Sequence, residues 1–215
     1  FIFARPNQPK QIISNNNEFN LLFIGDWGGI NGHFKHSGYA WGVARSMNNY
    51  ASLHPVESIF LMGDNFYDYG VQNVTDPRFE DTFQKTFSVD DLPHLANIQM
   101  PITSGNHDYH QNVTAQIEYT KIDPTKRWYY PDFWYTLNYK FSNPSINFGQ
   151  EINVDVVMID TQALLNEHQF DDPNYGEDVS EQHLNWIEES LKEMSGTSDY
   201  LFVVGHYPMY SVSYH

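Results

Sequence analysis

Four points along the chain place side chains able to bind a metal ion directly after a glycine. They are, in order, Gly25-Asp26, Gly63-Asp64 with Tyr67 close behind, Gly105-Asn106-His107-Asp108, and Gly205-His206. Carboxylate, amide and phenol oxygens with imidazole nitrogens, and no sulfur, suit hard or borderline ions such as Fe, Mn or Zn. An aspartate at a turn can use both oxygens and bridge two ions, as two-metal hydrolytic sites require. The set therefore predicts a metal site.

Tyr67 narrows the choice of metal. A phenol with an ordinary pKa of about 10 binds as a phenolate only beside a strong Lewis acid, and Fe(III) is a stronger one than a divalent ion. Taken singly, an aspartate after a glycine is most often a turn residue, and a lone tyrosine is most often a packed aromatic. Four compatible sets in one chain favour the metal interpretation.

The polar residues follow short apolar runs that indicate buried strands. Strands are predicted before Asp26, Gly63 and Gly105, at 152–160 and 200–208, and as an alternating, half-solvated strand at 133–141. Three helices are predicted, at 39–54, from Pro77 onward and at 179–194. The second has Phe79, Phe83 and Phe87 on one face. The third has Leu184, Ile187, Leu191 and Met194 on its buried side. This alternation predicts an α/β fold with helices covering a sheet. Sites in such sheets form outside the carboxyl ends of the strands, so we expect the polar strand ends to converge.

Composition limits the partners of the chain. Its 11 Lys and Arg against 27 Asp and Glu give a formal charge of −16, which argues against binding nucleic acid or an anionic membrane surface. No apolar run reaches the ~20 residues needed to span a bilayer. The absence of cysteine excludes thiolate nucleophiles, cysteine zinc sites and disulfides. Without a linker or an internal repeat, we expect one domain over 1–215 with a polar lead-in at 1–18.

Four motifs extend this interpretation to a family. "GDWGG", "GDNFY", "GNHD" and "GHYP", in this order and at comparable spacing, resemble the purple acid phosphatases of the metallophosphatase (calcineurin-like phosphoesterase) superfamily. The likeness is strongest to the small tartrate-resistant type. It covers the chain from Phe19 onward, and includes the connecting segments "SGNHDYHQNVTAQIEYTK" and "RWYYPDFWYTL". It implies a four-layer αββα sandwich of two mixed β-sheets flanked by helices.

The resemblance also implies roles for individual residues. Asp26 and Tyr67 would bind Fe(III), Asp64 would bridge both metals, and Asn106 and His206 would bind a divalent Fe, Zn or Mn ion. The implied activity is that of an acid phosphatase, a hydrolase in which a metal-bound hydroxide attacks a phosphate monoester at mildly acidic pH.

Two histidines would act on the substrate. By the same resemblance, His107 would contact the substrate phosphate, and His215 would protonate the leaving alcohol. The family's later "GHxH" motif, which supplies two more histidine ligands, does not occur in these residues. We therefore expect the C-terminal part of the fold to be missing and an apolar sheet edge to be left open.

Two other functions remain as alternatives. One is a phosphatase-like scaffold with weak or no activity, in an assembly whose partner covers the C-terminal edge. The other is a nuclease or phosphodiesterase of the wider superfamily, which Tyr67 and the acidic charge disfavour. The sequons at Asn73 and Asn112, together with the family, imply a glycoprotein in a secreted, lysosomal or other luminal compartment. The remaining histidines are expected mostly at the surface: His33, His36, His54, His94, His110, His168 and His183.

Overall fold

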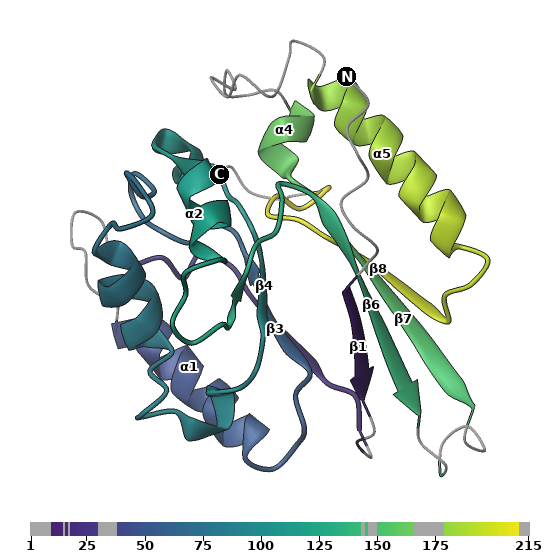
Figure 1. The fold of residues 1–215 in the computed structure, drawn as a ribbon, viewed down its shortest axis with the longest axis horizontal. Helices are drawn as coiled ribbons and strands as arrows, with labels where there is room; N and C mark the ends of the chain where they lie inside the picture. Colours follow the sequence, from purple (N-terminus) through teal and green to yellow (C-terminus); the bar gives the residue numbers. More distant parts are fainter. Residues whose placement is uncertain are drawn as a thin grey trace.

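The computed structural model describes residues 10–14, 16, 18–29, 38–142, 145, 150–165 and 179–210. They form two four-stranded sheets packed face to face, with helices on the outer face of each sheet (Figure 1). This layering confirms the predicted αββα sandwich.

The first sheet holds most of the predicted strand ends. Its strands are β2 (Leu21–Ile24), β3 (Ser58–Met62), β4 (Met100–Thr103) and β5 (Trp128–Tyr129), in that order. All described pairings in this sheet are parallel, whereas the sequence led us to expect a mixed sheet. Helical segments lie between consecutive strands: α1 (Gly38–Ala51), the π-helix η1 (Phe79–Gln84) with the short η2 (Pro93–Leu95), and η3 (His107–His110) with α2 (Val113–Tyr119). Such crossovers return the chain in the same direction, so the carboxyl ends of these strands share one edge.

The second sheet is mixed, as predicted. Its order is β1 (Lys10–Ser14), β6 (Tyr135–Ser142), β7 (Glu151–Met158) and β8 (Tyr200–Val204), with only the β6–β7 pairing antiparallel. The helices α4 (Thr161–Leu165) and α5 (Val179–Met194) lie between β7 and β8 in the chain and cover the outer face (Figure 1). Strand β1 lies within residues 1–18, so part of the polar lead-in forms a sheet edge.

The core lies between the sheets and beneath the helices. The inward face predicted for 133–141 is confirmed, because Tyr135, Leu137, Tyr139 and Phe141 are all buried, but the other face is not half-solvated throughout, because Trp134 and Asn138 are buried as well. Two of these tyrosines also join the sheets by hydrogen bonds: the Tyr135 hydroxyl donates to the carbonyl of Ile102 at 2.9 Å, and the Tyr139 hydroxyl donates to Ser58 Oγ at 2.8 Å. The three phenylalanines predicted on one helical face, Phe79, Phe83 and Phe87, are buried too.

Helix α5 presents a different face from the predicted one. Leu184, predicted as buried, is 59% exposed, while His183, predicted at the surface, is fully buried. The imidazole of His183 stacks on Trp134, with ring centroids 4.2 Å apart. A neutral imidazole is a flat ring that packs on an indole, which explains why His183 takes the inward position.

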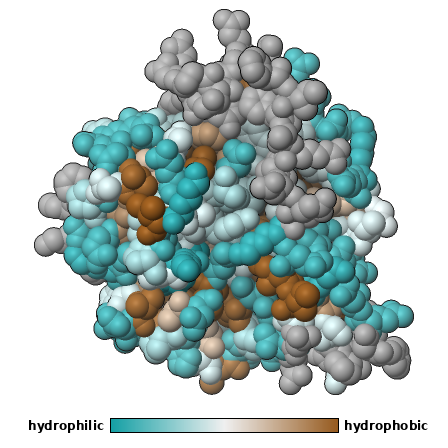
Figure 2. Space-filling view, viewed as in Figure 1, coloured by the Kyte–Doolittle hydropathy of each residue, from teal (hydrophilic) through white to brown (hydrophobic). Residues whose placement is uncertain are grey.

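The other surface histidines agree with the prediction where they are described. His94 and His110 are exposed, and His54 is half-buried, 2.8 Å from a carboxylate oxygen of Glu18. His33, His36 and His168 lie outside the described residues. Figure 2 shows a mostly hydrophilic face with apolar residues in small groups. Among the described residues, no helix has the length and apolarity that a membrane crossing requires.

Candidate metal centre

The predicted strand ends converge on one cluster. One side-chain ligand atom each from Asp26, Asp64 and His206 lies within 4.8 Å of the other two. Asp26 follows β2, Asp64 follows β3 and His206 follows β8, so both sheets contribute. The side chains of Asp64 and His206 are almost entirely buried, whereas Asp26 is exposed, so the cluster opens to solvent on the Asp26 side.

The two aspartates sit in an uncommon backbone conformation. The φ angles of Asp26 and Asp64 are 55° and 52°, in the left-handed region that non-glycine residues rarely adopt. Hydrogen bonds between the two turns hold them there: the Asp26 amide donates to the carbonyl of Gly63 at 3.1 Å, and the Gly28 amide donates to the carbonyl of Asp64 at 3.0 Å. Strain of this kind is typical of functional sites.

Tyr67 points its hydroxyl into this cluster. The phenol donates to Asp26 Oδ1 at 2.6 Å. Its pKa is raised far above the ordinary value, chiefly by burial and further by its hydrogen bonds to Asp26 and Asp64. Without a cation, the phenol therefore keeps its proton. A strongly charged ion between these oxygens would reverse that preference.

His206 and Asn106 complete the arrangement. A main-chain carbonyl can only accept, so His206 Nδ1, 2.8 Å from the Met62 carbonyl, carries the proton and donates. In the neutral ring, Nε2 then has a free lone pair, 3.2 Å from Asn106 Oδ1 and 3.6 Å from Asp64 Oδ1. His206 Nε2, Asn106 Oδ1 and Asp64 Oδ1 are all acceptors that face one another, and a cation between them would interact favourably with all three. The donor set thus fits a metal ion.

A glycine at the third turn makes room for the cluster. A Cβ placed on Gly105 would lie 2.3 Å from Asp64 Oδ1, closer than real atoms approach. Glycine, which has no Cβ, therefore permits the close passage of backbone beside the aspartate at this turn.

His107 lies beside the cluster, in contact with two neighbouring turns. Its backbone amide donates to Asp64 Oδ1 at 3.0 Å, and its ring Nδ1 donates to the carbonyl of Asp68 at 2.8 Å. The ring meets that of Tyr67 edge to face, with centroids 4.6 Å apart. His110 Nδ1 reaches the same Asp68 carbonyl at 2.7 Å. His215, the other predicted catalytic residue, lies outside the described residues.

Sequence reasoning missed the role of Asp108, which holds the turns of the cluster together. This fully buried carboxylate accepts from the amides of Asn65, Phe66 and Gly105 at 3.1, 3.2 and 2.8 Å, and from Gln116 Nε2 at 2.9 Å. Burial, the largest influence, raises its pKa to about 6. The signal was present in the sequence, because Asp108 ends the "GNHD" motif.

Asp160 is a second missed residue, on the other sheet. It accepts from Ser104 Oγ at 2.6 Å and from the amides of Gln162 and Ala163 at 2.9 and 3.0 Å, so it joins the turn after β4 to the start of α4. Burial raises the pKa of this carboxyl as well. Its position after the apolar run 152–159 was the only sequence signal.

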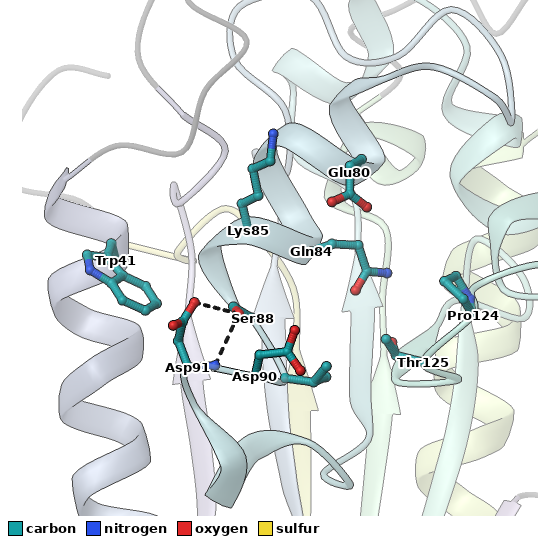
Figure 3. A pocket seen from close by; sticks show the side chains of 10 residues that line it. Trp41, Glu80, Gln84, Lys85, Ser88, Asp90, Asp91, Pro124 and Thr125 are labelled. Atoms are coloured by element: carbon teal, nitrogen blue, oxygen red, sulfur yellow. Dashed lines mark hydrogen bonds between the residues drawn. The ribbon is translucent and has the colours of Figure 1, made fainter.

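A hollow of about 500 Å³ lies elsewhere, between α1 and residues 80–91 (Figure 3). Its lining includes Trp41, Glu80, Asp90 and Asp91, and Ser88 Oγ donates to Asp91 Oδ2 at 2.8 Å. No histidine lines it, and none of the predicted site residues does. The strand-end cluster, which holds the predicted ligand residues, therefore remains the candidate site.

Comparisons with known proteins agree with this geometry. A family model described as calcineurin-like phosphoesterase matches residues 19–215. Human tartrate-resistant acid phosphatase type 5 is 34% identical over 200 residues, which cover 91% of this chain and 58% of the human protein. Purple acid phosphatase 7 of Arabidopsis thaliana is 36% identical over 109 residues, 51% of this chain and 30% of that protein. This chain thus spans less than three fifths of the length of these relatives.

A solved structure shares the fold. GAP50, described as the anchor in the inner membrane complex of Plasmodium, superposes with a TM-score of 0.74 at 22% identity, covering 90% of this chain and 56% of that one. The family model extends over nearly all of the chain and includes every residue of the strand-end cluster. The chain therefore belongs to the calcineurin-like phosphoesterase family, and within it is similar to the purple acid phosphatases.

Proposed function

We propose that the protein is a dinuclear metal-dependent acid phosphatase that hydrolyses phosphate monoesters. The observation that carries this proposal is the meeting of Asp26, Asp64 and His206 ligand atoms within 4.8 Å. The hydroxyl of Tyr67 on Asp26 and the amide oxygen of Asn106 beside His206 add two further ligands. Homology to acid phosphatases supports a phosphoesterase.

The residues divide between two ions in this proposal. Asp26 and Tyr67 would hold Fe(III), Asp64 would bridge both ions, and Asn106 and His206 would hold a divalent Fe, Zn or Mn ion. When bound, the two ions supply a water of lowered pKa and neutralise charge on the transferring phosphoryl group. The Met62 carbonyl fixes the His206 ring so that Nε2 faces the cluster, and the Asp64 side chain beside it is almost entirely buried.

His107 binds the substrate phosphate in this proposal. The carbonyl of Asp68 holds Nδ1–H, so Nε2 is the nitrogen left to contact a phosphate oxygen. The amide of His107 is bonded to Asp64, which places the imidazole beside the proposed bridging ligand. Protonation of the leaving alcohol by His215 remains a prediction.

A visible spectrum with metal analysis on the full-length protein tests the proposal. We expect a purple band from charge transfer between the Tyr67 phenolate and Fe(III), with about two metals per chain. A colourless, metal-free protein of full length would mean that the site is vestigial. Phosphate monoesters are the proposed substrates, and the charge of −16 disfavours nucleic acid.

An apolar groove favours a second function, that of a scaffold in an assembly. It measures about 430 Å³ and opens between β2, at the edge of the first sheet, and strands β6, β7 and β8 of the second, lined by Phe19, Leu21, Phe23, Phe141, Ile152, Val154, Tyr200 and Phe202. Within the described residues β8 pairs only with β7, so its other edge is open. A partner covering this C-terminal edge would bury both features. The fold shared with GAP50, described as an anchor, agrees with this role.

The metal content of the full-length protein separates the two functions. A scaffold with a vestigial site binds no metal and lacks the "GHxH" motif, whereas the enzyme binds two ions and contains it.

The sequons support a luminal or secreted glycoprotein. Asn73 is exposed, and its Oδ1 accepts from Thr75 N and Oγ1 at 2.9 and 2.8 Å. Asn112 is exposed as well and caps α2 through the Ala115 amide. Enzymatic removal of N-glycans from protein purified from its source should lower its apparent mass. An unchanged mass would refute the glycoprotein assignment.

A further inference from the structure

The segment 67–70 connects the proposed metal ligand Tyr67 to the proposed substrate-binding residue His107. Tyr67 lies at its start, with its hydroxyl on Asp26. The carbonyl of Asp68, the next residue, accepts from Nδ1 of His107 at 2.8 Å. A displacement of this segment would therefore move a metal ligand and the phosphate-binding imidazole together.

One buried side chain holds this segment at both ends. Arg78 is 3% exposed and precedes the π-helix η1. Its Nη2 donates to the carbonyl of Tyr67 and its Nη1 donates to the carbonyl of Gly70. The guanidinium also lies over the ring of Phe66, 5.5 Å from its centroid, which limits its movement. Two main-chain carbonyls that flank Asp68 are thus fixed by a single planar group.

We propose that Arg78 is a positioning residue, which sets the place of the Tyr67 phenol and the His107 imidazole by fixing the segment 67–70. A guanidinium suits this task because its rigid fork donates two hydrogen bonds at a set separation. Lysine keeps the charge but is a point donor on a flexible stem, so it cannot hold both carbonyls in one geometry. The part of this inference that concerns catalysis rests on the proposed metal centre.

Arg127 provides a matched control. It is 1% exposed, lies 5.4 Å from the centroid of the Phe83 ring, and donates to the carbonyl of Phe87 at 2.6 Å and to Gln84 Oε1 at 3.0 Å. All of these partners lie outside the segment 67–70. Arg127→Lys therefore imposes a comparable loss of buried contacts without touching this segment.

Amide hydrogen exchange on the metal-free protein tests the positioning role. The amide of Tyr67 donates to the carbonyl of Gly28 at 3.1 Å, and that of Gly70 donates to the carbonyl of Phe66 at 2.9 Å. We expect Arg78→Lys to speed exchange at Tyr67 and Gly70 about tenfold or more, since charge-assisted hydrogen bonds are lost. Arg127→Lys should leave these two amides unchanged. Equal exchange of the segment in the two variants would overturn the proposal.

The full-length, metal-loaded protein gives a second readout. At equal metal content, Arg78→Lys should shift or weaken the Tyr67 charge-transfer band and raise KM for a phosphate monoester, while Arg127→Lys should change neither. An unchanged band and KM in Arg78→Lys would refute a role for Arg78 in the site. A wild-type protein without any band would instead refute the proposed metal centre, and amide exchange would still decide what Arg78 does.

Discussion

The buried imidazole of His183 makes the stability of the protein depend on pH. His183 stacks on Trp134 inside the α5 interface, and its ring nitrogens have no hydrogen-bond partner among the described residues. Burial lowers its pKa to about 3, with a small opposing influence from the backbone of Asp160. We predict that acid favours unfolding through this residue.

The size of the effect follows from the two pKa values. The unfolded chain binds a proton with the ordinary histidine pKa of about 6.5, and the folded protein does so only near 3. Between these values the unfolded chain binds more protons, so the free energy of unfolding falls as pH falls, by about 1.4 kcal/mol per pH unit. From pH 7.5 to pH 5 the loss is about 2 kcal/mol, and below pH 3 it levels off.

The assay is urea unfolding of the metal-free protein at pH 7.5 and pH 5, for wild type and His183→Phe. Phenylalanine keeps a flat ring on Trp134 but binds no proton. The variant should therefore lose about 2 kcal/mol less between the two pH values than wild type does. Comparing each protein with itself removes any difference in absolute stability that the substitution causes.

An exposed histidine provides the control. His94→Phe should retain the wild-type pH dependence, because His94 lies at the surface. If His183→Phe and wild type lost the same stability on acidification, His183 would not be the neutral, buried group that the packing shows.

Four substitutions in the site test the other assignments. Asp64→Ala should abolish binding of both metals, measured by metal analysis, and full retention would exclude a bridging role. His107→Ala should keep both metals and lower kcat/KM about 100-fold, whereas unchanged turnover would remove His107 from the mechanism. Tyr67→Phe should remove the visible band, and a band that persists would assign the colour to another ligand. Asp108→Ala should lower the free energy of unfolding by about 3 kcal/mol, because several buried donors lose their acceptor; a loss under about 1 kcal/mol in urea unfolding would contradict this.

Local pattern was enough to predict the strands that end at the site. The runs before Asp26, Asp64 and Asn106 are short, apolar and closed by a glycine, and all three form strands. The strands before Asp64 and Asn106 are buried as predicted, whereas β2 is only half-buried, with Phe23 38% exposed. The helix at 179–194 was also predicted, but not its orientation. Its apolar stripe is weak, and hydropathy alone does not show that a neutral histidine can pack on an indole.

Contacts between distant segments could not be predicted in this way. Asp160 meets Ser104 across 56 residues of sequence, and the pairing of β1 with β6 joins residues more than 120 apart. Neither contact leaves a local pattern in the sequence. The roles of Asp108 and Asp160 were missed in part for the same reason, since the amides of Asn65 and Phe66 that bond Asp108 and the Ser104 hydroxyl that bonds Asp160 come from other turns.

These distant contacts explain how a site made from two sheets holds its shape. Three hydrogen bonds join the sheets beside it: Thr103 Oγ1 donates to the carbonyl of Ile159 at 2.9 Å, Ser104 Oγ donates to Asp160, and His206 Nδ1 donates to the carbonyl of Met62. The bond from His206 to Met62 also sets the orientation of the His206 ring, which is a proposed metal ligand. The same hydrogen bond therefore joins the two sheets and positions the ligand. His206 follows β8, which follows α5, where His183 is buried. If acid weakens the packing of α5, we therefore expect it to disturb the position of His206 as well. His206 is the one proposed ligand that the second sheet contributes among the described residues.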